Sequence, residues 1–94
     1  MLYLECEIRK AAGLRGTDVI AVVKDHSGAQ EQIQIEASFL VQRGMRYFLP
    51  VWGLSQDEDR KTVQVELPQE SASGTNRIWI RPEQVFYQKE EVPA

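Results

Sequence analysis

Histidine and cysteine, which often bind metals or act as catalytic groups, are almost missing from this sequence of 94 residues, because each occurs once, as His26 and Cys6. A zinc site needs three or four nitrogen, sulfur or oxygen ligands, and a nucleophile needs a base beside it. One cysteine also cannot form a disulfide within the chain. The sequence therefore predicts a protein that is not an enzyme, with no catalytic residues, no metal ligands and no cofactor.

Long hydrophobic stretches are missing as well. The longest purely aliphatic run is residues 19–23, far short of the roughly 20 residues that a membrane-spanning helix needs. No basic segment precedes an apolar one at the N-terminus, so we expect no secretory signal, no membrane binding and a cytoplasmic location. The 11 basic and 14 acidic residues give a net charge of −3, which does not favour nucleic acid but leaves a local basic face open.

Apolar residues at helical spacing are scarce, and alternation of apolar and polar residues takes their place. Strands are predicted at residues 2–8, 19–24, 31–36, 45–52, 62–67, 77–81 and 85–88. The pattern predicts a mainly β fold: a small antiparallel, partly open barrel or roll of five to seven strands with at most one short helix. It would form one β domain over residues 1–88, followed by a flexible C-terminal tail at residues 89–94.

The segments between these strands are predicted to be turns and loops. Residues 37–43 are interpreted as a short helical turn that Gly44 ends, with a strand as the open alternative. Residues 53–61 are predicted to form a polar loop, and residues 82–84 a single turn. Pro50 lacks an N–H group, so its strand is predicted to be at an edge or bulged there.

Two pairs of strands are predicted to form hairpins with a definite register. In the hairpin near the C-terminus, Val65 pairs with Ile78 on the inner face and Glu66 pairs with Arg77 on the outer face. A slip of one residue would place isoleucine against polar side chains, so this register is strongly specified.

The other predicted hairpin is nearer to the N-terminus, across the turn 25–28. There the register is expected to pair Lys24 with Glu31 and Val22 with Ile33. Turn-forming aspartate and glycine in residues 25–28 support the reversal of the chain.

Residues 74–85, Gly-Thr-Asn-Arg-Ile-Trp-Ile-Arg-Pro-Glu-Gln-Val, resemble the closing segment of SH3-like small barrels. In those barrels a strand with an aromatic residue leads to a short 3₁₀ turn with proline and then to a final strand. The resemblance implies an SH3-like barrel. The acidic loop and aromatic residues of the proline-peptide groove do not precede the segment, so the resemblance implies no binding residues.

The strongest candidate site is the outer face of the strand at residues 77–81. Alternation places Arg77, Trp79 and Arg81 there together, opposite the two isoleucines. A guanidinium group can bind carboxylate or phosphate with two parallel hydrogen bonds, and an indole ring offers a stacking surface. Arg46, Trp52 and Phe48 would extend this face if their strand lies nearby.

This face predicts a protein-interaction module, with Trp79, Arg77, Arg81, Arg46 and Trp52 as its binding residues. The first alternative is a nucleic-acid-binding barrel that uses the same arginines and aromatic rings. A second is a structural domain that forms homo-oligomers through an unpaired strand edge, so the chain would be a monomer or a weak homodimer.

Each of these features also has a purely structural interpretation. Trp79 could be covered by residues 37–43 or by the tail, with Arg77 paired to Glu66. Cys6 is expected to be a buried, inert thiol. The remaining polar features are expected to be solvated loops or turns: Arg9, Lys10 and Arg15 with Gly13 and Gly16, the acidic residues 57–59, and His26.

Overall fold

The computed structural model describes residues 1–10, 13–14 and 16–88 of the chain. The predicted tail and Arg15 lie outside these residues. The elements are β1 (Leu2–Arg9), β2 (Asp18–Lys24), β3 (Gln30–Glu36), the 3₁₀ turn η1 (Ala37–Phe39), β4 (Val41–Arg43), β5 (Arg46–Asp57), β6 (Thr62–Glu66), β7 (Arg77–Ile80), the 3₁₀ turn η2 (Pro82–Gln84) and β8 (Val85–Tyr87).

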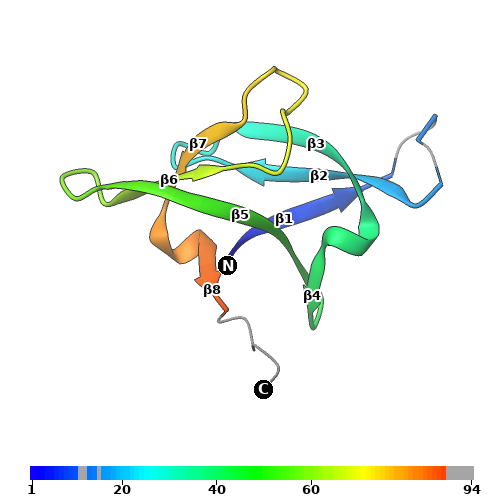
Figure 1. The fold of residues 1–94 in the computed structure, drawn as a ribbon, viewed down its shortest axis with the longest axis horizontal. Helices are drawn as coiled ribbons and strands as arrows, with labels where there is room; N and C mark the ends of the chain where they lie inside the picture. The colour runs from blue at the N-terminus through cyan, green and yellow to red at the C-terminus, as the bar shows by residue number, and fades with distance from the viewer. Residues whose placement is uncertain (11–12, 15, 89–94) are drawn as a thin grey trace.

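These strands form one antiparallel sheet in the order β3-β2-β1-β5-β6-β7, with β4 paired to β5 and β8 paired to β1. The sheet curls into a half-barrel, and the two outer strands β3 and β7 lie near one another at its open side (Figure 1). The prediction of a mainly β, partly open barrel is confirmed. β4, an additional short strand, raises the seven predicted strands to eight.

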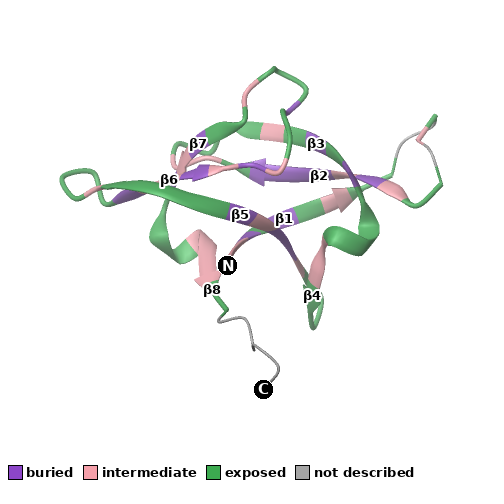
Figure 2. Ribbon diagram, viewed as in Figure 1, coloured by how far each residue is buried: buried purple, intermediate pink, exposed green. Residues whose placement is uncertain are grey.

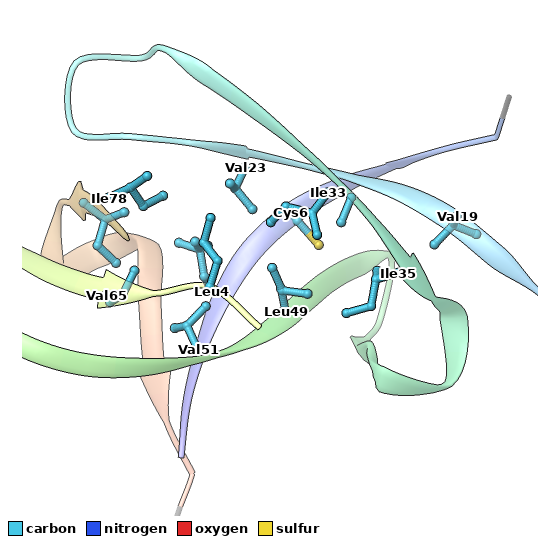
Figure 3. Close-up of a cluster of buried hydrophobic side chains, with 13 residues drawn as sticks. Leu4, Cys6, Val19, Val23, Ile33, Ile35, Leu49, Val51, Val65 and Ile78 are labelled. Carbon is cyan, nitrogen blue, oxygen red and sulfur yellow. The ribbon is translucent and has the colours of Figure 1, made fainter. Parts of the chain in front are cut away.

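The inner, concave face of the half-barrel carries the hydrophobic core. Alternate residues of a strand point to the same face, so buried and exposed positions alternate along β3, whereas residues 21–23 of β2 are all buried (Figure 2). Leu4, Leu49 and Ile33 are fully buried at the centre, and side chains from β1, β2, β3, β5, β6 and β7 point toward one another there (Figure 3). Burying each such side chain contributes about 1.5–3 kcal/mol.

The long strand β5 connects the two ends of the half-barrel and corrects one prediction. Residues 53–57 continue the strand and pair with β6, so the predicted loop at 53–61 shrinks to a turn at residues 58–61. A bulge between Gly53 and Ser55 bends the strand at this point. A Cβ atom at Gly53 would lie 2.9 Å from Leu2 Cδ1, so a larger residue there would require the end of the Leu2 side chain to move.

Pro50 lies within β5, opposite Tyr3 of β1, and not at the bulge. On the other edge of β5, β4 pairs with residues 46–48 and β6 pairs from residue 52 onward. Met1 and Gln88 exchange both backbone hydrogen bonds, and alternation along the ladder then directs the Pro50 nitrogen away from β1. The Pro50 nitrogen therefore faces the side of β5 on which no strand pairs with this residue. The missing N–H group costs the sheet no hydrogen bond.

The predicted register of the hairpin near the C-terminus is confirmed, since Val65 pairs with Ile78 and Glu66 pairs with Arg77. The strand ends one residue earlier than predicted, at Ile80. Arg81 instead begins η2, where its backbone N–H donates to Gln84 Oε1 at 2.6 Å.

The predicted register of the other hairpin is wrong by one residue. Glu31 pairs with Val23, and Ile33 pairs with Ala21. The turn decides this, because the Asp25 carboxylate accepts hydrogen bonds from the N–H groups of Ser27 and Ala29, at 2.8 and 3.0 Å, and closes a five-residue turn. Partial burial acts to raise the pKa of Asp25, but the Ser27 hydroxyl and these N–H groups lower it below its usual value.

Residues 37–43 are half turn and half strand. The first three form η1, and the last three form β4, which pairs with the start of β5. Gly44 has a positive φ of 59° and lies in the tight turn between these strands, not at the end of a helix. The strand alternative for this segment is therefore correct for its second half.

Candidate functional site

The outer face of β5, β6 and β7 brings three of the predicted binding residues together. Trp52 lies opposite Glu66, and Glu66 lies opposite Arg77 on the next strand. In the neighbouring row, Gln64 lies between Ser55 and Trp79. We call these six residues the Trp52 surface: Trp52, Ser55, Gln64, Glu66, Arg77 and Trp79.

Trp52 is the most accessible aromatic ring of this surface, with 49% of the residue exposed. Arg77 is exposed beside it. Although the register places Arg77 opposite Glu66, no ion pair or hydrogen bond joins the Arg77 guanidinium to any other described residue, and only the Arg77 carbonyl accepts a side-chain bond, from the Thr75 hydroxyl. The guanidinium group is therefore available to a ligand, and its position beside an open indole ring suits a carboxylate flanked by an apolar group.

Trp79 and Arg81 are more closely tied to the chain. Trp79 is half-buried, and its carbonyl accepts the N–H of His26 at 2.8 Å. Arg81 donates from Nε to the His26 carbonyl at 3.1 Å. The turn between β2 and β3 thus fixes the position of the end of β7. Trp79 is the half-buried member of the Trp52 surface, and Arg81 lies next to this surface but outside it.

Arg46 and Phe48 do not join this surface. They lie at the other end of β5, six and four residues before Trp52, which is roughly 20 and 13 Å along a strand. Arg46 forms an ion pair with Glu5 of β1, and this carboxylate raises the pKa of Arg46. Phe48 is only 6% exposed, and the Phe86 ring packs against it.

These two residues belong to a second group of rings and charges. Phe86 of β8 packs edge-on against Phe48, with 4.7 Å between ring centroids, and stacks on Tyr3 at 5.2 Å. The Arg43 guanidinium carbon lies 4.1 Å from the Phe86 ring centroid. We call this group the Phe86 cluster, and its members are Tyr3, Glu5, Arg43, Arg46, Phe48 and Phe86.

The Phe86 cluster was not predicted from the sequence. Its members come from four strands. The only signal in the sequence is that alternation places each member on the outer face of its strand. A shallow depression of about 300 Å³ lies beside Arg43 and Phe86. Every ring of the cluster has a partner within the chain, and so does each of its two guanidinium groups.

The cysteine thiol and the groups that could bind a metal lie outside both groups of residues or carry no site among the described residues. Burial, followed by the nearby charge of Glu5, raises the pKa of the Cys6 thiol to about 12. No three histidine, cysteine, aspartate or glutamate side chains of residues 1–10, 13–14 and 16–88 gather in a way that could hold a metal ion. Over the same residues, no helix has the length and apolar character needed to cross a bilayer.

Comparison of the chain with models of protein families, with curated protein sequences and with solved structures gives no match.

Proposed function

We propose that this chain is a non-catalytic interaction module that binds a protein partner through the Trp52 surface. The observation that carries the proposal is the exposure of 49% of Trp52 beside an arginine without an intramolecular partner among the described residues. Tryptophan and arginine dominate binding energies at protein interfaces, because both combine a large apolar area with specific polar groups. A partner segment with an apolar side chain for Trp52 and a carboxylate for Arg77 would fit this chemistry.

The charge of the surface favours protein over nucleic acid. Residues 52–57, 62–66 and 77–80 contain one arginine and no lysine, and they also contain Glu66 and Asp57. A nucleic-acid backbone is bound by several cations that follow successive phosphates, with aromatic rings between them. One cation among two carboxylates provides little attraction for a polyanion.

Two further observations support the proposal of a non-catalytic module with an SH3-like architecture. The only cysteine is buried and its raised pKa keeps the thiol protonated, which fits a protein without nucleophilic catalysis. The chain order from β7 through η2 to β8, with β8 returning to pair with β1, supports the SH3-like architecture inferred from residues 74–85.

The test uses a library of random peptides displayed on phage, selected against the whole protein. We expect enriched peptides with acidic and apolar residues, and we expect Trp52→Ala and Arg77→Ala each to weaken their binding at least about tenfold. Phe39→Ala and Arg60→Ala are matched controls, because both residues are exposed and lie outside the Trp52 surface. Enriched peptides that bind the Trp52→Ala variant as well as the wild type would show that another surface is used.

A titration with a single-stranded oligonucleotide tests the alternative that the chain binds nucleic acid. If that alternative were correct, affinity would fall steeply with salt, by a log–log slope of roughly −0.7 for each phosphate contacted. We expect no saturable binding at moderate salt. Tight, strongly salt-dependent binding that Arg77→Ala weakens would replace the protein partner with nucleic acid.

A further inference from the structure

The outer edge of β3 is the longest regular strand edge at the open side of the half-barrel. The carbonyl of Gln32 accepts the N–H of Ala72 at 2.8 Å, from outside the sheet. Backbone groups alternate between the two edges of a strand, so the N–H and C=O groups of Gln30, Gln32 and Gln34 all point away from β2. Among the described backbone groups, only the Gln32 carbonyl of this set has a partner.

The loop at residues 67–76, between β6 and β7, holds this edge at one point. The hydroxyl groups of Ser71 and Ser73 both donate to Glu31 Oε2 at 2.7 Å. Ser71 is only 6% exposed, and its N–H donates to the Thr75 carbonyl, which closes the loop on itself. Figure 1 shows the loop rising over β3 from the end of β6.

The edge beneath this loop is suited to pairing with itself. β3 is seven residues long, regular, and free of lysine, proline and bulges, which are the usual features that protect an edge strand. In an antiparallel register that sets Gln32 of one copy against Gln34 of the other, Glu31 faces Ile35 and Glu36 faces Gln30. No two carboxylates lie opposite one another. The bulged free edge of β5 has no such regularity.

We propose that the 67–76 loop is a releasable clasp that keeps β3 from pairing with β3 of a second copy of this chain. While the two serine hydroxyls and the Ala72 N–H hold the edge, a second strand cannot reach the Gln32 carbonyl. Once the clasp opens, the edge groups of both copies become each other's partners and an antiparallel dimer forms. This inference is independent of the Trp52 surface, which lies on other strands.

Ser73→Glu tests the clasp because it sets a second carboxylate against Glu31. In hydrogen exchange followed by NMR, we expect faster exchange of the Ala72 amide. In sedimentation velocity, we expect the mass of the variant to rise from the monomer toward twice 10.8 kDa with concentration, while the wild type stays monomeric. Ser38→Glu is the matched control, because it adds the same charge at an exposed serine of η1, outside both the loop and the Trp52 surface. It is expected to stay monomeric.

A second substitution shows whether β3 is the dimer interface. Gln34→Pro removes an edge donor that no other described group uses, at a position where an edge strand accepts proline. The double variant Ser73→Glu/Gln34→Pro should keep the fast exchange at Ala72 and return to the monomer. A dimer that survives Gln34→Pro, or an open clasp without a dimer, would overturn the proposal.

The milder Ser73→Ala covers the case in which added charge unfolds the chain. It removes one of the two bonds to Glu31, and we expect a smaller shift of the same kind in exchange and in mass. Unchanged protection of Ala72 in both serine variants would show that the hydroxyls do not hold the loop. Unfolding of both would show that the loop supports the fold and cannot be released.

Discussion

The Trp52 surface and the Phe86 cluster both combine aromatic rings, arginine and glutamate, and both include outer-face residues of β5, yet they differ in one respect. In the Phe86 cluster, each ring packs on another ring, and each guanidinium group meets a ring or a carboxylate. In the Trp52 surface, the most exposed ring and its neighbouring arginine have no such partners among the described residues. Arginine beside aromatic residues is therefore not a binding signal by itself.

The difference arises from which strands reach each end of β5. Phe86 lies on β8, which pairs with β1 opposite Tyr3, and its ring stacks on Tyr3 and packs edge-on against Phe48, in the half of β5 that begins with Arg46. Toward the other end, β1 begins at Leu2, opposite Val51, and none of the ring–ring contacts of the described residues includes Trp52. Aromatic residues on the outer face contribute to stability where a ring from a neighbouring strand packs on them, as on Phe48. They stay exposed where no such ring does, as at Trp52.

The comparison is tested most strongly by removing one ring from each group. Phe48→Ala should lower the free energy of unfolding by about 3–5 kcal/mol, because it leaves a cavity under Phe86. Trp52→Ala should cost about 1 kcal/mol or less, because half of the ring faces water. Urea denaturation of both variants gives the two values. Equal losses would mean that Trp52 is as structural as Phe48.

A less drastic change separates the ring contacts of Phe86 from its bulk. Phe86→Leu keeps an apolar side chain but removes the stack on Tyr3, the edge contact with Phe48 and the contact with Arg43. We expect a loss of about 1–2 kcal/mol by thermal unfolding. Tyr87→Leu changes the adjacent residue, which is 69% exposed, and should cost about 0.5 kcal/mol or less. If Tyr87→Leu cost more, the cluster would not centre on Phe86.

How far the sequence could predict the fold depends on how different the two faces of each strand are. β6 alternates between polar and apolar residues, and β7 has two isoleucines on one face with Arg77 and Trp79 on the other, so only one register satisfies both faces, and Val65 opposite Ile78 could be predicted. Residues 19–23 of β2 are apolar at every position, so a shift by one residue still pairs apolar side chains. The Asp25 turn, whose geometry depends on side-chain hydrogen bonds, decides the register there.

The candidate site was predictable only in part for a related reason. Alternation assigned Arg77, Trp79 and Trp52 to the outer side of their strands, and the pairing through Glu66 and Gln64 brings them together. Alternation also placed Arg46 and Phe48 on that side, but it does not show what covers a residue. The ring that packs on Phe48 belongs to Phe86, more than 35 positions away in the chain, and no local pattern reveals it.

Removing one arginine from each of the two groups should have a smaller effect on stability. Arg43→Ala removes the contact with Phe86 and should cost about 0.5–1 kcal/mol. Arg77→Ala removes no ion pair or side-chain hydrogen bond among the described residues and should change the free energy of unfolding by no more than about 0.5 kcal/mol in either direction. Chemical denaturation at low and high salt measures both. A clear loss for Arg77→Ala that salt reduces would reveal an ion pair with Glu66 in solution.

The smallest change in stability, and the most direct view of the Trp52 surface, comes from exchanging each tryptophan for phenylalanine. Trp79→Phe leaves Trp52 as the only indole, and Trp52→Phe leaves Trp79. Because Trp52 is about half exposed and Trp79 is half-buried against the His26 turn, the emission of Trp52 should be red-shifted and more readily quenched by acrylamide. The reverse order would mean that Trp79 is the open ring, and the binding surface would then be centred on β7 and extend toward Arg81.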